Sequence, residues 1–151
     1  DSKTGQDFSI AVVPVYNMGE GEESRPSIKF EAEEALYAAE KTGNFKDDDY
    51  VDFGNKSPAS IQWEVSTGLA GIHLMRFRYM NVSDHPISVK FEIIAANGTV
   101  VRNDEITFPI RDEKWKILNT TTGGYINAGK YKIRISGEDL EGLRLESFEF
   151  Q

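Results

Sequence analysis

Three segments of the sequence alternate strictly between apolar and polar residues, and this alternation constrains the fold more than any other feature. They span residues 61–65, 89–93 and 131–135. Successive side chains of a strand point to opposite faces, so such alternation is typical of strands with one buried and one solvated face. Further segments that we interpret as strands span residues 8–16, 28–32, 50–53, 72–80, 100–108 and 143–150.

Turn-forming sequences separate these segments and complete the prediction of fold class. Asn97-Gly98 indicates a tight hairpin, because this dipeptide suits a two-residue turn. Residues 32–41 alone have the composition of a helix, and Tyr37 and Thr42-Gly43 disfavour one there. Eight or nine short strands with regular turns predict an all-β fold, an antiparallel β-sandwich or jelly roll.

The length of 151 residues fits one domain with a sizeable core. We expect residues 28–151 to form the sandwich. Residues 1–27 are interpreted as an N-terminal extension that contains an extra strand or the remnant of a neighbouring domain, followed by a linker. The chain begins at Asp1 without a signal-like segment, so we expect a processed or excised piece.

Charge and composition exclude several classes of function. The chain has 25 acidic and 17 basic residues, and its net charge of −8 disfavours binding to a phosphate backbone. No apolar run approaches the ~20 residues that span a bilayer, so no membrane span is expected. Because there is no cysteine, disulfides, thiolate metal sites and cysteine nucleophiles are excluded.

Catalytic motifs are also missing, and we predict that the chain is not an enzyme. Neither His73 nor His85 has a serine or aspartate at a catalytic spacing, and no HExxH or glycine-rich phosphate loop is present. His73 lies among apolar neighbours, which favours a hydrogen-bonded core histidine over a catalytic one.

Several short sequences follow one another in a fixed order between residues 28 and 151. They are Phe-Glu-Ala-Glu-Glu-Ala at 30–35, Asp-Tyr-Val-Asp-Phe at 49–53, the alternating segment around Trp63, the segment from Ala70-Gly71 to Arg78-Tyr79-Met80-Asn81, Trp115, Ala128-Gly129 with the strand after it, and Leu-Glu-Ser-Phe-Glu-Phe at 145–150. This order and spacing resembles the carbohydrate-binding modules of families 6 and 35. The resemblance implies a galactose-binding-domain-like β-sandwich, in agreement with the alternation.

The resemblance implies a non-catalytic carbohydrate-binding module that targets an appended polysaccharide-degrading enzyme to glycan. Its partners would be an oligo- or polysaccharide and the appended catalytic domain, and its location secreted, periplasmic or cell-surface. The alternative is a structural accessory β-sandwich of a glycoside hydrolase or similar enzyme, with no sugar binding of its own. The apolar segment 8–16 and losses from the family's loop motifs favour that alternative.

The family pattern nominates four residues for sugar binding. Trp115 would stack on a sugar ring and Tyr50 would form a second wall, while Arg144 and Asp139 would supply polar contacts. Trp115 has polar neighbours, which leaves ligand contact and half-buried packing both open. Arg144 stands where the families usually have asparagine. Trp63 alternates with polar residues and is expected in the core.

A structural calcium is the one cofactor that the pattern implies. Glu31 and Glu33 lie two residues apart on an expected strand, so their carboxylates share a face, and a hard cation would relieve their repulsion. The resembling families place calcium here with a third acid from the last strand, which is Glu146 in this chain in place of their usual aspartate. The alternative is a solvated acidic edge.

Overall fold

The structure is a computed structural model that describes residues 27–110 and 114–151. The expected extension of residues 1–27, with the strand expected at 8–16, lies outside the described residues apart from Ser27. The elements in chain order are β1 (Ile28–Glu31), the 3-10 turn η2 (Ala32–Glu34), β2 (Leu36–Ala38), β3 (Lys41–Phe45), β4 (Asp48–Asp52), β5 (Ala59–Thr67), β6 (Leu74–Asn81), β7 (Ile87–Ala95), β8 (Val100–Phe108), β9 (Lys116–Thr121), β10 (Gly129–Gly137) and β11 (Leu143–Phe150).

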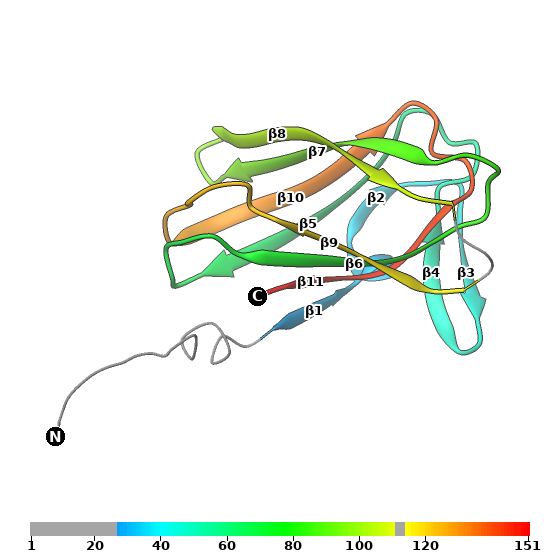
Figure 1. Ribbon diagram of the computed structural model, residues 1–151, viewed down its shortest axis with the longest axis horizontal. Helices are drawn as coiled ribbons and strands as arrows, with labels where there is room; N and C mark the ends of the chain where they lie inside the picture. The colour runs from blue at the N-terminus through cyan, green and yellow to red at the C-terminus, as the bar shows by residue number, and fades with distance from the viewer. Residues whose placement is uncertain (1–26, 111–113) are drawn as a thin grey trace, which may run out of the picture.

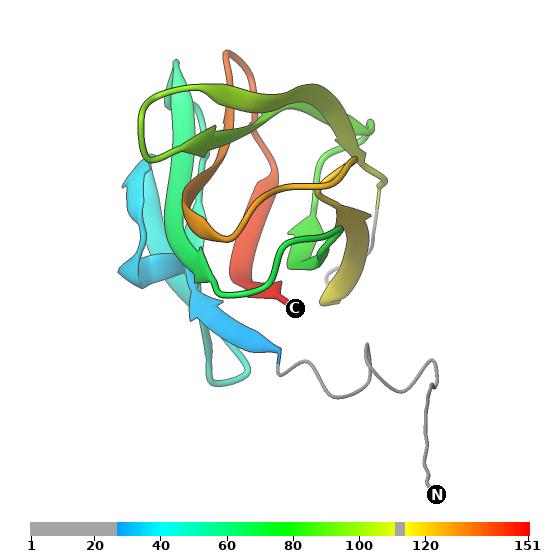
Figure 2. The ribbon, with the colours of Figure 1, turned by 90° about the vertical axis from the view of Figure 1, so that its left-hand side faces the viewer.

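These strands form two antiparallel sheets that pack face to face (Figures 1 and 2). The site sheet has the order β3-β4-β11-β6-β9, and β1 also pairs with β11. The back sheet has the order β2-β5-β10-β7-β8. The all-β sandwich predicted from the alternation is therefore confirmed. The only helical element in the described ranges is η2, so none there could span a membrane.

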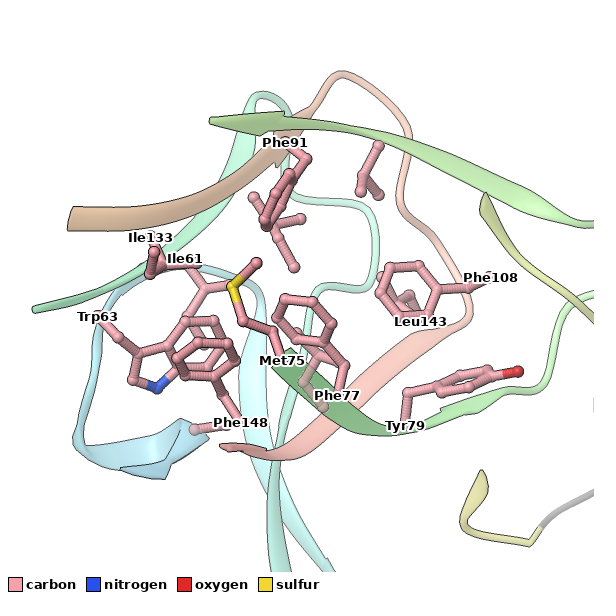
Figure 3. Packing of buried hydrophobic residues seen from close by; sticks show 14 of the residues in the cluster. Ile61, Trp63, Met75, Phe77, Tyr79, Phe91, Phe108, Ile133, Leu143 and Phe148 are labelled. Carbon is pink, nitrogen blue, oxygen red and sulfur yellow. The ribbon is translucent and has the colours of Figure 1, made fainter. Parts of the chain in front are cut away.

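Alternation along the strands determines which side chains enter the core. Trp63 on β5 is buried, as predicted, and stacks on Phe148 of β11 with ring centres 4.9 Å apart. Phe77 of β6 lies 5.1 Å from the same Phe148 ring, so aromatic residues of both sheets meet in the middle of the sandwich (Figure 3). The predicted hairpin at Asn97-Gly98 joins β7 to β8, and Gly98 has a φ of 89°.

Three strands were missed because they lack strict alternation. Residues 32–41 form the turn η2 and the short edge strand β2 rather than a helix. β3 and β9 are the outermost strands of the site sheet, where only one side of the strand is paired. In β9, Leu118 packs on the core while its neighbour Ile117 is exposed, so two adjacent apolar residues followed by polar ones hide the alternation in the sequence.

Candidate functional site

Tyr50 lies on the outer face of the site sheet because of the alternation of β4. Its neighbour Val51 points into the core and is fully buried. Gly43 lies opposite Tyr50 in the β3–β4 register, and a Cβ on Gly43 would lie 2.5 Å from the Tyr50 ring. The missing side chain of Gly43 therefore lets the tyrosine ring lie across β3.

Trp115 immediately precedes β9 and joins Tyr50 in a group of rings that we call the aromatic stack (Phe45, Tyr50 and Trp115). The indole contacts Tyr50 edge-on, with ring centres 5.8 Å apart, and contacts Phe45 at 6.4 Å. Trp115 and Phe45 are half-buried, whereas Tyr50 is only 9% exposed. The indole Nε1 of Trp115 is buried and has no hydrogen-bond partner among the described residues.

Two arginines of the site sheet cover the aromatic stack. The guanidinium of Arg78 on β6 lies 5.3 Å from the Trp115 ring centre, and that of Arg144 on β11 lies 5.1 Å from the Tyr50 ring centre. Arg144 Nε also lies 3.5 Å from a carboxylate oxygen of Asp52. Cation–π contacts and ion pairs together fix both guanidinium groups on the sheet.

Arg144 also lines a pocket of about 510 Å³, which we call the polar pocket. Its lining also includes Asp139 and Glu141 from the loop between β10 and β11, Asp84 and His85 from the loop between β6 and β7, and Glu40, Lys41 and Asp52. A hydrogen bond with His85 holds the pKa of Asp84 below its usual range. Carboxylates of the polar pocket can accept hydrogen bonds from hydroxyls, while Lys41 and Arg144 can donate them.

The structure thus brings the four expected sugar-binding residues into two adjoining groups. Tyr50 and Trp115 belong to the aromatic stack, Asp139 lines the polar pocket, and Arg144 contacts both. Sequence reasoning did not nominate Phe45 for sugar binding. An aromatic residue between polar neighbours next to a turn was the signal that could have found it.

The three glutamates expected to bind calcium do not form one ligand set. The ammonium of Lys29 on β1 lies 3.4 Å from Glu31 and 3.5 Å from Glu146, so a lysine occupies the position between these two carboxylates. Burial opposes the charge of this ammonium, yet Glu146 and Glu31 outweigh it and raise the pKa of Lys29. Glu146 is buried, and its other oxygen lies 3.3 Å from Arg78.

The strand that was expected to carry both Glu31 and Glu33 ends at Glu31, and Glu33 lies in the turn η2. Partial desolvation and the neighbouring carboxylate of Asp49 raise the pKa of Glu33. Within the described ranges no group of three acidic or histidine side chains is arranged to hold a metal ion. Lys29 contacts Glu31 and Glu146 in this structure, and calcium at Glu31, Glu33 and Glu146 stays a prediction.

His73 has the role expected of a core histidine. Its side chain is 2% exposed and its ring stacks on Phe150 at 4.9 Å. The two ring nitrogens lie 3.0 Å from the carbonyl oxygen of Gln151 and 2.9 Å from that of Leu69. Both nitrogens are therefore in contact with backbone acceptors inside the protein.

No protein-family model matches the sequence, and no curated protein is significantly similar to it. Solved structures are similar in fold. A family 35 carbohydrate-binding module from Clostridium thermocellum is 19% identical, with a TM-score of 0.68, and the match covers 83% of this chain and 98% of that one. The C-terminal family 6 module of a marine laminarinase from Zobellia galactanivorans is 18% identical, with a TM-score of 0.66 and coverage of 83% and 99%.

A third similar structure contains such a module within a longer chain. It is a β-(1,4)-mannanase from Podospora anserina with a family 35 module, 18% identical, with a TM-score of 0.57. The match covers 83% of this chain and 27% of that one. At these identities the likeness establishes the fold, which is that of the carbohydrate-binding modules of families 6 and 35.

Proposed function

We propose, from the fold shared with the carbohydrate-binding modules of families 6 and 35, that this domain binds oligo- or polysaccharide and is not catalytic. The observation that carries the proposal is the contact of Arg144 with both the aromatic stack and the polar pocket. A sugar offers an apolar C–H face and a rim of hydroxyls. An aromatic platform beside a pocket of hydrogen-bonding groups matches both parts of such a ligand.

The exposure of the rings assigns them different tasks in this proposal. Trp115 and Phe45 are half-buried, so in this proposal a ligand contacts the part of each side chain that stays exposed beside Arg78, whereas Tyr50 is 9% exposed and mainly supports Trp115. Arg144 is oriented by Asp52 and by the Tyr50 ring, so its guanidinium is ordered before a ligand arrives. Such preorganisation reduces the entropy lost on binding.

The charge of the polar pocket supports selection of neutral sugars. Five carboxylates line it, against the single lysine and the single arginine. An anionic sugar would meet net repulsion there, because like charges at close range destabilise a complex. We therefore propose a neutral glycan as the ligand, in preference to one rich in uronic acids.

We further propose that the domain targets an appended polysaccharide-degrading enzyme to its glycan, in a secreted, periplasmic or cell-surface protein. Support comes from the mannanase of Podospora anserina, whose chain contains a module of the same fold. A structural calcium at Glu31, Glu33 and Glu146 is also part of the proposal. It would displace the ammonium of Lys29 from Glu31 and Glu146 and help to hold β1 against β11.

Calorimetric titration of the whole chain with cello-, xylo-, manno- and laminari-oligosaccharides, and with a polygalacturonate oligosaccharide, tests the proposal. We expect at least one neutral series to bind and Trp115→Ala to weaken it about tenfold, a loss of ~1.4 kcal/mol. Tyr37→Ala, which removes an exposed ring from the back sheet, is the control and should bind normally. If none of these glycans binds, or Trp115→Ala binds as the wild type does, the proposal is wrong.

A further inference from the structure

Tyr125 is a second aromatic residue displayed to solvent, at the other end of the sandwich. It lies in the loop between β9 and β10, and 70% of its side chain is exposed. Trp115 immediately precedes β9 and Tyr125 follows it, so the six residues of β9, about 20 Å of extended strand, lie between the two residues. In Figure 1 this loop lies at the left, opposite the β3–β4 hairpin at the right. The two rings cannot contact the same sugar unit.

The loop that carries Tyr125 is held firmly on both sides of the ring. Beyond it, Gly71 and Ile126 exchange two backbone hydrogen bonds of 2.9 and 3.0 Å. Before it, the Thr122 amide donates to the His73 carbonyl at 3.0 Å, and the Thr122 hydroxyl donates to the Gly124 carbonyl at 2.7 Å. Because the exposed Tyr125 ring contributes little to the stability of the fold, packing does not explain why it is there. The ordered backbone on both sides of it reduces the entropy that would be lost when a ligand binds the ring.

A fixed ion pair lies beside this platform. Arg102 on β8 donates to Asp104 at 2.9 Å and to the Thr121 carbonyl, and its guanidinium covers Phe91 at 4.9 Å. Gly123 makes room for it, because a Cβ there would lie 2.8 Å from Arg102 Nε, and Gly123 also has a φ of 78°. The guanidinium and the carboxylate are thus positioned without any help from a ligand.

The ring and the ion pair line one open pocket of about 470 Å³, together with Val101 and the Gly123-Gly124 backbone. Asp104 is half exposed and can accept hydrogen bonds from hydroxyls, while Arg102 can donate them. One ring and one ion pair offer far less surface than the ~800 Å² that a protein partner typically covers. The size and chemistry of the pocket fit one or two sugar units.

We propose that Tyr125, Arg102 and Asp104 form a second saccharide-binding site, separate from the aromatic stack. Its ligand is a neutral saccharide whose apolar face covers the Tyr125 ring while its hydroxyls bond to Asp104 and Arg102. The inference rests on the proposed function for the class of ligand, but not on the aromatic stack being active. Two sites at opposite ends of one domain let it hold two glycan chains, or two parts of one chain, with a gain in avidity.

Amide chemical shifts of the 15N-labelled chain, titrated with the neutral oligosaccharides named above, test this site directly. We expect the amides of Gly123 and Gly124 to shift on titration. They should still shift in Trp115→Ala, and they should no longer shift in Tyr125→Ala. Tyr37→Ala, the matched exposed tyrosine on β2, should leave the shifts of both glycines unchanged.

The outcomes separate the two proposals. Shifts near Trp115 with none at Gly123 and Gly124 overturn the second site and leave the proposed function standing. Shifts at the two glycines alone overturn the role of the aromatic stack and support the second site. If Tyr125→Ala instead changes the sedimentation coefficient of the ligand-free chain, Tyr125 belongs to a contact between copies and the second site is wrong.

Binding to insoluble polysaccharide gives a second readout. If both sites bind, Tyr125→Ala should reduce retention on the polymer about tenfold while the affinity of the aromatic stack for a short oligosaccharide stays unchanged. Equal retention of Tyr125→Ala and wild type on every neutral polymer that binds the chain would contradict the inference.

Discussion

The guanidinium of Arg144 lies over the ring of Tyr50, 5.1 Å from its centre. The two residues come from neighbouring strands of the site sheet, and in the register between β4 and β11 Arg144 pairs with Asp52. The same arginine therefore packs on the aromatic stack, pairs with a carboxylate and lines the polar pocket. The chemistry proposed for the site depends on these three contacts being made at once.

Arg144→Lys should separate binding from folding. A lysine keeps the charge but lacks the planar group that covers a ring and pairs with a carboxylate at the same time. We expect affinity for the best neutral oligosaccharide to fall about tenfold, or ~1.4 kcal/mol, with little change in melting temperature. Arg134→Lys, on β10 of the back sheet, is the control for titration calorimetry. Equal affinities of the two variants would contradict the role of Arg144.

Gly43→Ala should displace the Tyr50 ring. The new methyl group would lie 2.5 Å from ring atoms of Tyr50, closer than any ordinary contact, so the ring must move. We expect a loss of ~1–3 kcal/mol in the free energy of unfolding, the usual effect of overpacking, and weaker sugar binding. Gly68→Ala is the matched control, because nothing lies within 4 Å of its added Cβ. Urea unfolding of both variants measures the difference.

Lys29→Ala tests whether the Lys29 ammonium occupies the position at which calcium would bind Glu31 and Glu146. Glu146 is buried, and removing the Lys29 ammonium leaves it with Arg78 alone, so we expect a lower melting temperature in a chelator. Added calcium should then stabilise Lys29→Ala more than it stabilises the wild type, because its competitor has been removed. Lys130→Ala, on β10, is the control. Equal calcium-induced shifts in wild type and Lys29→Ala would show that Lys29 does not compete.

Glu33→Gln should stabilise the domain at neutral pH in the presence of a chelator. The pKa of Glu33 is raised above its ordinary value of 4.5, so its ionised form is less favourable in the folded chain than in the unfolded chain. This destabilisation is absent below pH 4.5 and develops as the pH rises through the raised pKa. The melting temperature of Glu33→Gln should therefore exceed that of wild type at pH 7 and match it in acid.

The control for this measurement is Glu105→Gln, on the exposed face of β8. It should show no comparable gain at neutral pH. A gain for Glu33→Gln that persists unchanged into acid would mean that the unfavourable ionised form of Glu33, through desolvation and the nearby Asp49, is not its cause.

Strands whose two faces differ in solvent contact were the predictable part of the fold. β5, β7 and β10 lie inside the back sheet with one face on the core, so alternation identified all three. β3 was missed because its sequence, Lys-Thr-Gly-Asn-Phe, has a single apolar side chain and none of its residues is fully buried. Its pairing with β4 therefore leaves no alternation in the sequence.

The candidate site was only partly predictable, because much of it depends on register. Trp115, Tyr50, Arg144 and Asp139 were nominated from the order of sequence motifs, and they lie in two adjoining groups. The contact of Lys29 with Glu146 joins opposite ends of the described chain, and the pairing of β11 with β6 shifts register between Leu145 and Ser147; no local pattern indicates either feature. Tyr125 was not considered, since a single tyrosine beside two glycines looks like an ordinary turn.

The central position of β11 in the site sheet has a consequence for how the domain matures in the cell. β11 pairs with β1, β4 and β6. The strand β1 can therefore pair only after β11, more than a hundred residues later in the chain, has been synthesised. Contacts of such long sequence separation slow folding. The sheet cannot close on a ribosome that has not yet passed residue 150, and until then the edges of β4 and β6 need protection from aggregation.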